Sequence, residues 1–257
     1  MDAIKGLLFD IGGVLYVGNT PIEGAPQTVK ELMTRYPMRF LTNTTRTTPQ
    51  TIYENLSKMG FAIPPESLFT ALDATKSYIR ERVGTAYTVL TDEAERYFEE
   101  LRSENPDFVV VGDAHTNFTY ARMNGAFRAL QKGAKLVAAA KNRYFKDDDG
   151  ALSMDAGGFI AALEFAVGVE ATLIGKPSRD FFTLAASSMG LNPGEVLMVG
   201  DDIESDIKGA QDAGMKAMLV KTGKYCEGDL DRGIVPDGVL ESVAQLPKWL
   251  ERASFKD

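Results

Sequence analysis

The chain has 257 residues, of which 44% are hydrophobic, and a formal net charge of −8 at pH 7. This length and composition are sufficient for one large domain or two modest domains with a full hydrophobic core, and they exclude general disorder. The acidic balance, without any block of Lys or Arg, argues against nucleic acid and against an anionic membrane surface as partners.

Cysteine and histidine are scarce, which limits the chemistry that the chain can perform. A single Cys226 excludes an intrachain disulfide framework and predicts a reducing, cytoplasmic location. A single His115 cannot build a histidine metal cluster, and "GDAHTNF" is typical of a polar loop. No apolar run approaches the roughly 18 residues of a membrane helix, and we expect no N-terminal targeting segment. Carboxylates, hydroxyls, lysines and backbone amides must therefore carry any catalysis.

Short apolar runs alternate with helical patterns along almost the whole chain. Strands are predicted at residues 7–11, 39–43, 87–91, 108–112, 134–140, 171–175, 195–201 and 217–223, and helices around residues 29–36, 47–60, 117–133 and 179–190. Continuous apolar runs are typical of strands buried on both faces of a parallel sheet. Gly18 and Asn19 predict a tight hairpin turn after the first strand. The alternation predicts an α/β fold with right-handed crossovers.

Two polar motifs follow the first two predicted strands. In "LLFDIGG", Asp10 stands at the carboxyl end of a buried strand, where open α/β sheets bind their ligands. In "RFLTNTTR", Thr42 and Asn43 offer a hydroxyl and backbone amides that are able to hold the oxygens of an anion. Each motif alone also fits an ordinary turn or loop.

Two further motifs follow later strands. In "LIGKPS", Lys176 precedes a predicted helix, so that an ammonium group and a helix N-terminus would face the same point, although a solvated lysine is the common alternative. In "VLMVGDDIESDIKG", Asp201 and Asp202 end a buried strand and Asp206 follows in the first turn of a helix. Helix capping explains an acidic residue at Asp206 but not the adjacent pair of Asp201 and Asp202. Because crowded carboxylates repel one another, they favour a hard divalent cation such as Mg²⁺.

In this order, the four motifs resemble the signature of the haloacid dehalogenase (HAD) superfamily of aspartate-nucleophile hydrolases. The resemblance implies a Rossmann-like parallel-sheet core at residues 1–82 and 175–257, with an inserted α/β cap of the C2 type at residues 83–174. It implies catalytic roles for Asp10, Thr42 and Lys176, a Mg²⁺ site at Asp10, Asp201 and the Gly12 carbonyl, support from Asp202 and Asp206, and substrate contacts by Ile11, Gly12, Thr42, Asn43 and Lys176.

The insert resembles the cap of the class IIA branch. The motifs "DIGGVLY", "LTNTTR", "KNRYF", "GKPS", "GDDIESD" and "LVKTGKY" are similar to the branch of phospholysine phosphohistidine inorganic pyrophosphate phosphatases. This likeness implies a small phosphorylated substrate, a homodimer, and substrate contacts by the loop residues Lys141, Asn142, Arg143 and Tyr144. A solvated turn is the alternative reading of that loop.

Position 12 departs from the family pattern. Most phosphatases of the superfamily read Asp-x-Asp, and the second Asp protonates the leaving group; here the residue is Gly12. Two functions stay open. One is a Mg²⁺-dependent phosphatase that hydrolyses phosphoric monoester, pyrophosphate or P–N bonds through an aspartyl-phosphate on Asp10. The other is a weak or silent relative that binds Mg²⁺ and phosphoryl ligands as a sensor or scaffold. The retained Asp10, Thr42, Lys176 and Asp201 favour the enzyme.

Overall fold

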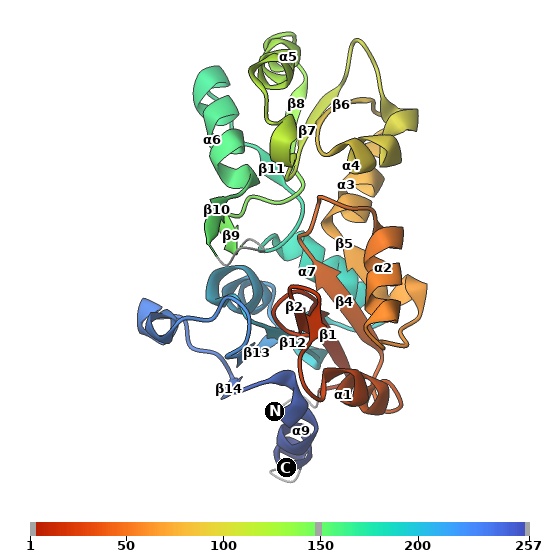
Figure 1. The fold of residues 1–257 in the computed structure, drawn as a ribbon, viewed down its shortest axis with the longest axis vertical. Coiled ribbons are helices and arrows are strands. Elements are labelled where there is room, and N and C mark those ends of the chain that lie inside the picture. Colours follow the sequence, from red (N-terminus) through yellow and green to blue (C-terminus); the bar gives the residue numbers. More distant parts are fainter. Residues whose placement is uncertain (1–3, 147–150, 255–257) are drawn as a thin grey trace. The chain divides into compact units, whose positions relative to one another are not determined.

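The computed structural model describes residues 4–146 and 151–254, which fall into two compact units (Figure 1). The first unit comprises Met1–Thr42, Tyr53–Phe69 and Lys176–Asp257, and the second comprises Asn43–Ile52 and Thr70–Gly175. The second unit is thus inserted into the chain of the first. The helix at residues 71–80 belongs to the second unit, whereas the sequence-based range 1–82 includes it in the core; that domain division stays a prediction.

The first unit contains a six-stranded sheet with the order β14-β13-β12-β1-β4-β5. Its strands are β1 (Gly6–Asp10), β4 (Met38–Thr42), β5 (Leu68–Thr70), β12 (Val196–Gly200), β13 (Lys216–Val220) and β14 (Gly238–Leu240). β1 pairs in parallel with β4 and with β12, and both β1 and β12 are buried along their whole length. The carboxyl ends of β1, β4 and β12 therefore meet at one edge of the sheet.

The helices of this unit are α1 (Ala25–Leu32), α2 (Pro49–Lys58, shared with the second unit), α7 (Arg179–Ser187), α8 (Gly209–Asp212), α9 (Leu246–Ser254) and a π-helix (Ile203–Lys208). In α1, Ala25, Thr28, Val29 and Leu32 are buried, which is the spacing of one helix face. The predicted hairpin is present as β2 (Tyr16–Val17) and β3 (Thr20–Pro21), joined through Gly18 at a positive φ.

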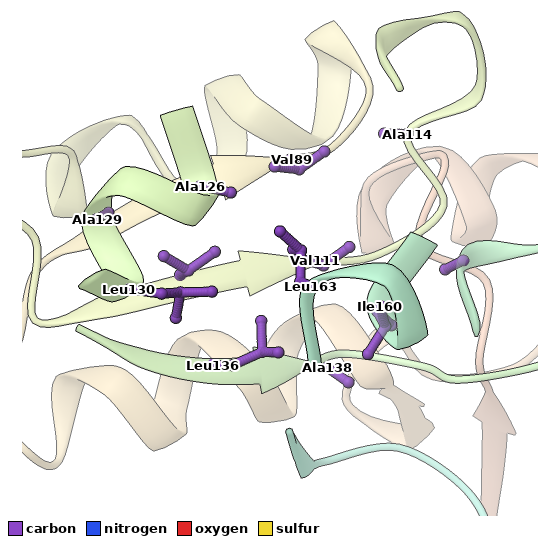
Figure 2. Close-up of a cluster of buried hydrophobic side chains, with 12 residues drawn as sticks. Val89, Val111, Ala114, Ala126, Ala129, Leu130, Leu136, Ala138, Ile160 and Leu163 are labelled. Carbon is purple, nitrogen blue, oxygen red and sulfur yellow. The ribbon is translucent and has the colours of Figure 1, made fainter. Parts of the chain in front are cut away.

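The second unit has its own four-stranded parallel sheet, in the order β11-β8-β7-β6. Its strands are β6 (Ala86–Val89), β7 (Phe108–Val111), β8 (Lys135–Ala138) and β11 (Thr172–Leu173). A separate antiparallel pair consists of β9 (Tyr144–Lys146) and β10 (Leu152–Met154). The helices of this unit are α3 (Ala71–Arg80), α4 (Asp92–Tyr97), α5 (Tyr120–Gln131) and α6 (Ala156–Val167). In Figure 2, Val111 and Leu136 of the strands pack with Leu130 of α5 and Leu163 of α6. This unit therefore has a separate hydrophobic core.

Short 3-10 helices occur at Pro65–Ser67, Glu99–Leu101, His115–Asn117, Pro193–Glu195, Glu227–Arg232 and Val243–Gln245. All of the strands and helices predicted from the sequence are present, and the predicted α/β class is confirmed. In the described residues, every helix is too short or too polar to cross a membrane. The cytoplasmic location and the homodimer stay predictions.

Candidate active site

Asp10 and Lys176 form the centre of a buried polar cluster in the first unit. Asp10 is the last residue of β1, and Lys176 immediately precedes the segment that leads to α7. The Lys176 ammonium donates to Asp10 Oδ1 at 2.5 Å and to Asp206 Oδ1 at 2.6 Å. Burial alone would lower the pKa of Lys176, but the charges of Asp10 and Asp206 raise it above its ordinary value. The lysine therefore stays charged and links two carboxylates.

Asp206 fixes the end of β12. It lies on the π-helix and is fully buried. Its Oδ2 accepts hydrogen bonds from the backbone N–H groups of Asp201 at 3.2 Å and Asp202 at 3.1 Å. A Cβ atom at Gly200 would lie 2.2 Å from the Asp206 Cβ, so only glycine permits this approach. Burial raises the pKa of Asp206 to about 6, against the opposing charge of Lys176. Both Asp206 oxygens are thus occupied, which favours a supporting role over direct metal ligation.

Asp201 is the second carboxylate delivered by a strand end. It is buried, and its Oδ2 accepts the backbone N–H of Lys224 at 2.7 Å. Burial, and then the charges of Asp10 and Asp206, raise the pKa of Asp201 well above its ordinary value. Gly13 and Gly223, both at positive φ, make room for this carboxylate, because a Cβ at either position would lie within about 2 Å of Asp201 Oδ2.

The cluster has a surplus of negative charge. One carboxylate oxygen from each of Asp10, Asp201 and Asp206 lies within 4.8 Å of the others. When all three are ionised, the single buried Lys176 leaves two negative charges uncompensated. Among the described residues, no hydrogen bond reaches Asp10 Oδ2 or Asp201 Oδ1. Carboxylate oxygens with this surplus charge fit a hard divalent cation such as Mg²⁺.

Asp202 lies beside the cluster but has its own partners. Its Oδ1 accepts the backbone N–H groups of Glu204 and Ser205, both at 3.0 Å, and thereby caps the π-helix. Its Oδ2 lies 3.7 Å from the Lys224 ammonium. Burial opposes ionisation, but the positive charge of Lys224 and these N–H donors lower the pKa of Asp202 overall. Asp202 is therefore an ionised, paired residue that shapes the loop.

The remaining predicted residues of this unit follow the same sheet edge. Thr42 is buried at the end of β4, where Asp10 of β1 is in register with Leu41. The side chain of Ile11 is buried, which leaves only its backbone for substrate. Gly12 is exposed, its φ is not positive, and a Cβ atom there would meet nothing within 4 Å.

Other predicted contacts belong to the second unit. Asn43 Nδ2 donates to Asn142 Oδ1 at 3.3 Å. Lys141 donates to both carboxylate oxygens of Glu164, at 2.7 and 2.8 Å. Arg143 and Tyr144 are exposed. The structure therefore connects two of these residues to each other, and their roles in substrate binding stay predictions.

His115 is exposed, but it begins the short 3-10 helix His115–Asn117 where a polar loop was predicted. Cys226 is an exposed, free thiol. The loop of Thr222, Gly223 and Lys224 was not predicted to be part of the cluster. The available signal was its position directly after β13, which neighbours β12 in the sheet.

Comparison with known proteins identifies the class. Residues 7–104 match the family model described as haloacid dehalogenase-like hydrolase, and residues 173–246 match the model described as HAD-hydrolase-like. Haloacid dehalogenase-like hydrolase domain-containing protein 2 from Bos taurus is 39% identical over 231 residues, covering 90% of this chain and 89% of its own length. Phospholysine phosphohistidine inorganic pyrophosphate phosphatase from Danio rerio is 37% identical over 252 residues, covering 95% of this chain and 93% of its own length.

Among solved structures, a 4-nitrophenylphosphatase from Thermotoga maritima superposes with a TM-score of 0.88 at 28% identity, covering 96% of this chain and 97% of its own. The comparisons confirm the predicted class, a hydrolase of phosphorylated substrates, and the predicted fold, a HAD core with an inserted cap domain. The chain belongs to the haloacid dehalogenase-like hydrolase family.

Proposed function

We propose that this chain is a Mg²⁺-dependent phosphatase that works through an aspartyl-phosphate on Asp10. The observation that carries the proposal is the buried cluster in which one ammonium group, that of Lys176, joins Asp10 to Asp206 beside Asp201. The two similar proteins whose names are phosphatases support the substrate class. A site that only needed to be stable would balance its buried charges within the chain.

In this mechanism, Asp10, Asp201 and the Gly12 carbonyl would hold Mg²⁺, which when bound supplies neutralising charge and polarises a phosphoryl oxygen. An Asp10 oxygen attacks phosphorus, the bond to the leaving group breaks, and its electron pair goes to the leaving atom. Lys176 orients the Asp10 carboxylate and neutralises phosphoryl oxygens, and the Thr42 hydroxyl donates to one of them. Water then attacks phosphorus and loses a proton to solvent, the bond from phosphorus to the Asp10 oxygen breaks, and its electron pair returns to the Asp10 carboxylate.

Gly12 restricts the substrates. A general acid typically contributes about 10²- to 10⁴-fold, and glycine offers no proton to the leaving group. We therefore expect substrates with good leaving groups to react faster than alkyl phosphates. The good leaving groups are aryl oxygens, phosphate in a P–O–P anhydride, and a phosphoramidate nitrogen that already carries its proton.

The test is hydrolysis of an aryl phosphate with Mg²⁺ or with a chelator, by the wild type and by Asp10→Asn. We expect turnover only for the wild type with Mg²⁺. If instead the wild type binds Mg²⁺ and inorganic phosphate but turns over no aryl, P–O–P or P–N substrate, the chain is the silent relative that binds these ligands as a sensor or scaffold.

A further inference from the structure

The loop that carries Lys224 lies against the segment that lacks the acid. The Thr222 hydroxyl donates to the Gly13 carbonyl at 2.5 Å. A Cβ atom at Gly223 would lie 2.4 Å from Gly13 Cα, so the two backbones are in direct contact. Lys224 therefore follows a glycine that is packed on Gly13, the neighbour of Gly12 in the sequence.

Lys224 combines a hydrogen-bonded backbone N–H with a partly exposed ammonium group. Its N–H is held by Asp201 Oδ2, whereas its side chain is 38% exposed and its ammonium lies 3.7 Å from Asp202 Oδ2. Lys176, in contrast, is 4% exposed and is held by two carboxylates at 2.6 Å or less. An exposed ion pair as long as that of Lys224 contributes little to stability. Of these two lysines, Lys224 is the one that can exchange its carboxylate for a substrate anion.

We propose that the Lys224 ammonium binds leaving groups that carry a negative charge of their own, and thereby determines specificity in place of the acid missing at position 12. The inference rests on the proposed phosphatase function. When the anhydride P–O bond breaks, its electron pair goes to the leaving phosphate oxygen, and Lys224 pairs with the negative charge that this phosphate already carries before the bond breaks. Without Lys224, the nearby Asp202 would repel a charged leaving group. A protonated amine leaving from a phosphoramidate gains nothing from this ammonium.

The test compares Lys224→Gln with Lys221→Gln. Glutamine keeps the backbone N–H that Asp201 accepts. Lys221 is a matched control, since it is an equally exposed lysine three residues earlier that pairs with Glu241 at 2.7 Å. With Mg²⁺, we expect Lys224→Gln to lower kcat/KM for pyrophosphate by about 10- to 100-fold, the size of a hydrogen bond to a charged group. Turnover of an aryl phosphate should change by less than about threefold. Lys221→Gln should change neither, and Lys224→Arg should restore pyrophosphate turnover.

Calorimetry provides a readout that is independent of turnover. Lys224→Gln should weaken the binding of imidodiphosphate with Mg²⁺ and leave the binding of inorganic phosphate unchanged. Equal losses on pyrophosphate and aryl phosphate, or no loss on either, would overturn the role of Lys224 and leave the phosphatase intact. If the wild type hydrolyses neither substrate, the proposed function fails, and the imidodiphosphate measurement still decides whether Lys224 selects a second phosphate.

Discussion

Both units of this chain place acidic residues after the strands of a parallel sheet, but they balance the charge differently. In the first unit, one buried lysine pairs with Asp10 at the end of β1 and with Asp206 of the π-helix after β12, and Asp201 lies in the same cluster. In the second unit, Asp113 follows β7 and has its own cation, because Arg46 Nε donates to Asp113 Oδ2 at 2.5 Å. Asp113 Oδ1 also accepts the backbone N–H of His115 at 3.0 Å.

The difference shows which feature distinguishes a candidate active site from other carboxyl ends of strands. The carboxyl edge of a parallel sheet is where α/β proteins bind ligands, yet the edge of the second unit satisfies Asp113 within the chain. The Arg46 guanidinium is further held over the Phe145 ring at 4.4 Å. In the first unit, buried carboxylates outnumber their cations, and either protons or a cation from outside the chain must balance the surplus. Surplus charge, and not the fold alone, distinguishes the two edges.

The largest effect should come from removing the nucleophile. Asp10→Asn keeps the shape of the side chain but loses its charge, and it should lower aryl phosphate turnover by at least roughly 10³-fold. Asp113→Asn makes the same change at the edge of the second unit and should leave that turnover within about threefold, because its charge is already paired. Steady-state kinetics on both variants would refute the comparison if the two losses were alike.

Metal affinity should depend on the surplus acids. Asp201→Ala removes one of the three crowded carboxylates and should weaken Mg²⁺ binding by about 100-fold or more. Glu204→Gln is a suitable control, since Glu204 is an exposed acid on the π-helix whose Arg232 partner is 3.4 Å away. Isothermal titration calorimetry measures the Mg²⁺ affinity of both variants. An unchanged affinity in Asp201→Ala would contradict the metal assignment.

Position 12 allows the missing acid to be restored. Gly12→Asp has open space for its side chain and no positive φ to oppose it, so we expect a folded protein with alkyl phosphate turnover raised by up to about 10²-fold. Gly13→Ala, one residue later, should be destabilised and lose Mg²⁺ affinity, because its Cβ would lie 1.9 Å from Asp201 Oδ2 at a φ of +84°. A folded, metal-bound Gly12→Asp without any gain on alkyl phosphates would refute the missing-acid account.

The fold was predictable where the apolar pattern is strong. Continuous apolar runs such as 108–112 and 195–201 identify buried parallel strands, and the observed β7 and β12 lie within them. The helix α6, "AGGFIAALEFAV", was missed because it is apolar on almost all sides and has no helical period. The strands β5 and β14 were missed because each has only three residues.

The site was predictable where strands deliver residues to one edge. The motifs placed Asp10, Lys176 and Asp206 together because sheet order brings distant strand ends side by side, and the structure connects all three. The contact between Thr222 and Gly13 joins loops 209 residues apart in the sequence. No local pattern encodes such an approach, so the position of Lys224 emerges only from the folded chain.

Acid should weaken Mg²⁺ binding at the metal site. The folded pKa of Asp206 is raised to about 6 from 3.8, so its contribution to the stability of the metal-free protein is fully present below about pH 3.8 and is lost as pH rises through 6. Mg²⁺ needs the ionised cluster and must displace this proton at low pH. The Mg²⁺ affinity should therefore fall by about tenfold between pH 7.5 and pH 5. Titration calorimetry at both values checks this, and an affinity that does not change with pH would contradict it.

The smallest effect concerns the paired edge itself. Arg46 and Asp113 are partly exposed, with 31% and 15% of their side chains accessible, so their pairing should add only about 1 kcal/mol to the free energy of unfolding. Each single variant, Arg46→Ala or Asp113→Ala, also loses other contacts, namely the Phe145 contact or the loop hydrogen bonds. A double-mutant cycle of the two, measured by urea denaturation, isolates the coupling between Arg46 and Asp113 from these losses. A coupling of several kcal/mol would mean that the charges of this pair interact as strongly as the buried charges of the first unit. The contrast between a balanced and an unbalanced strand edge would then lose its physical basis.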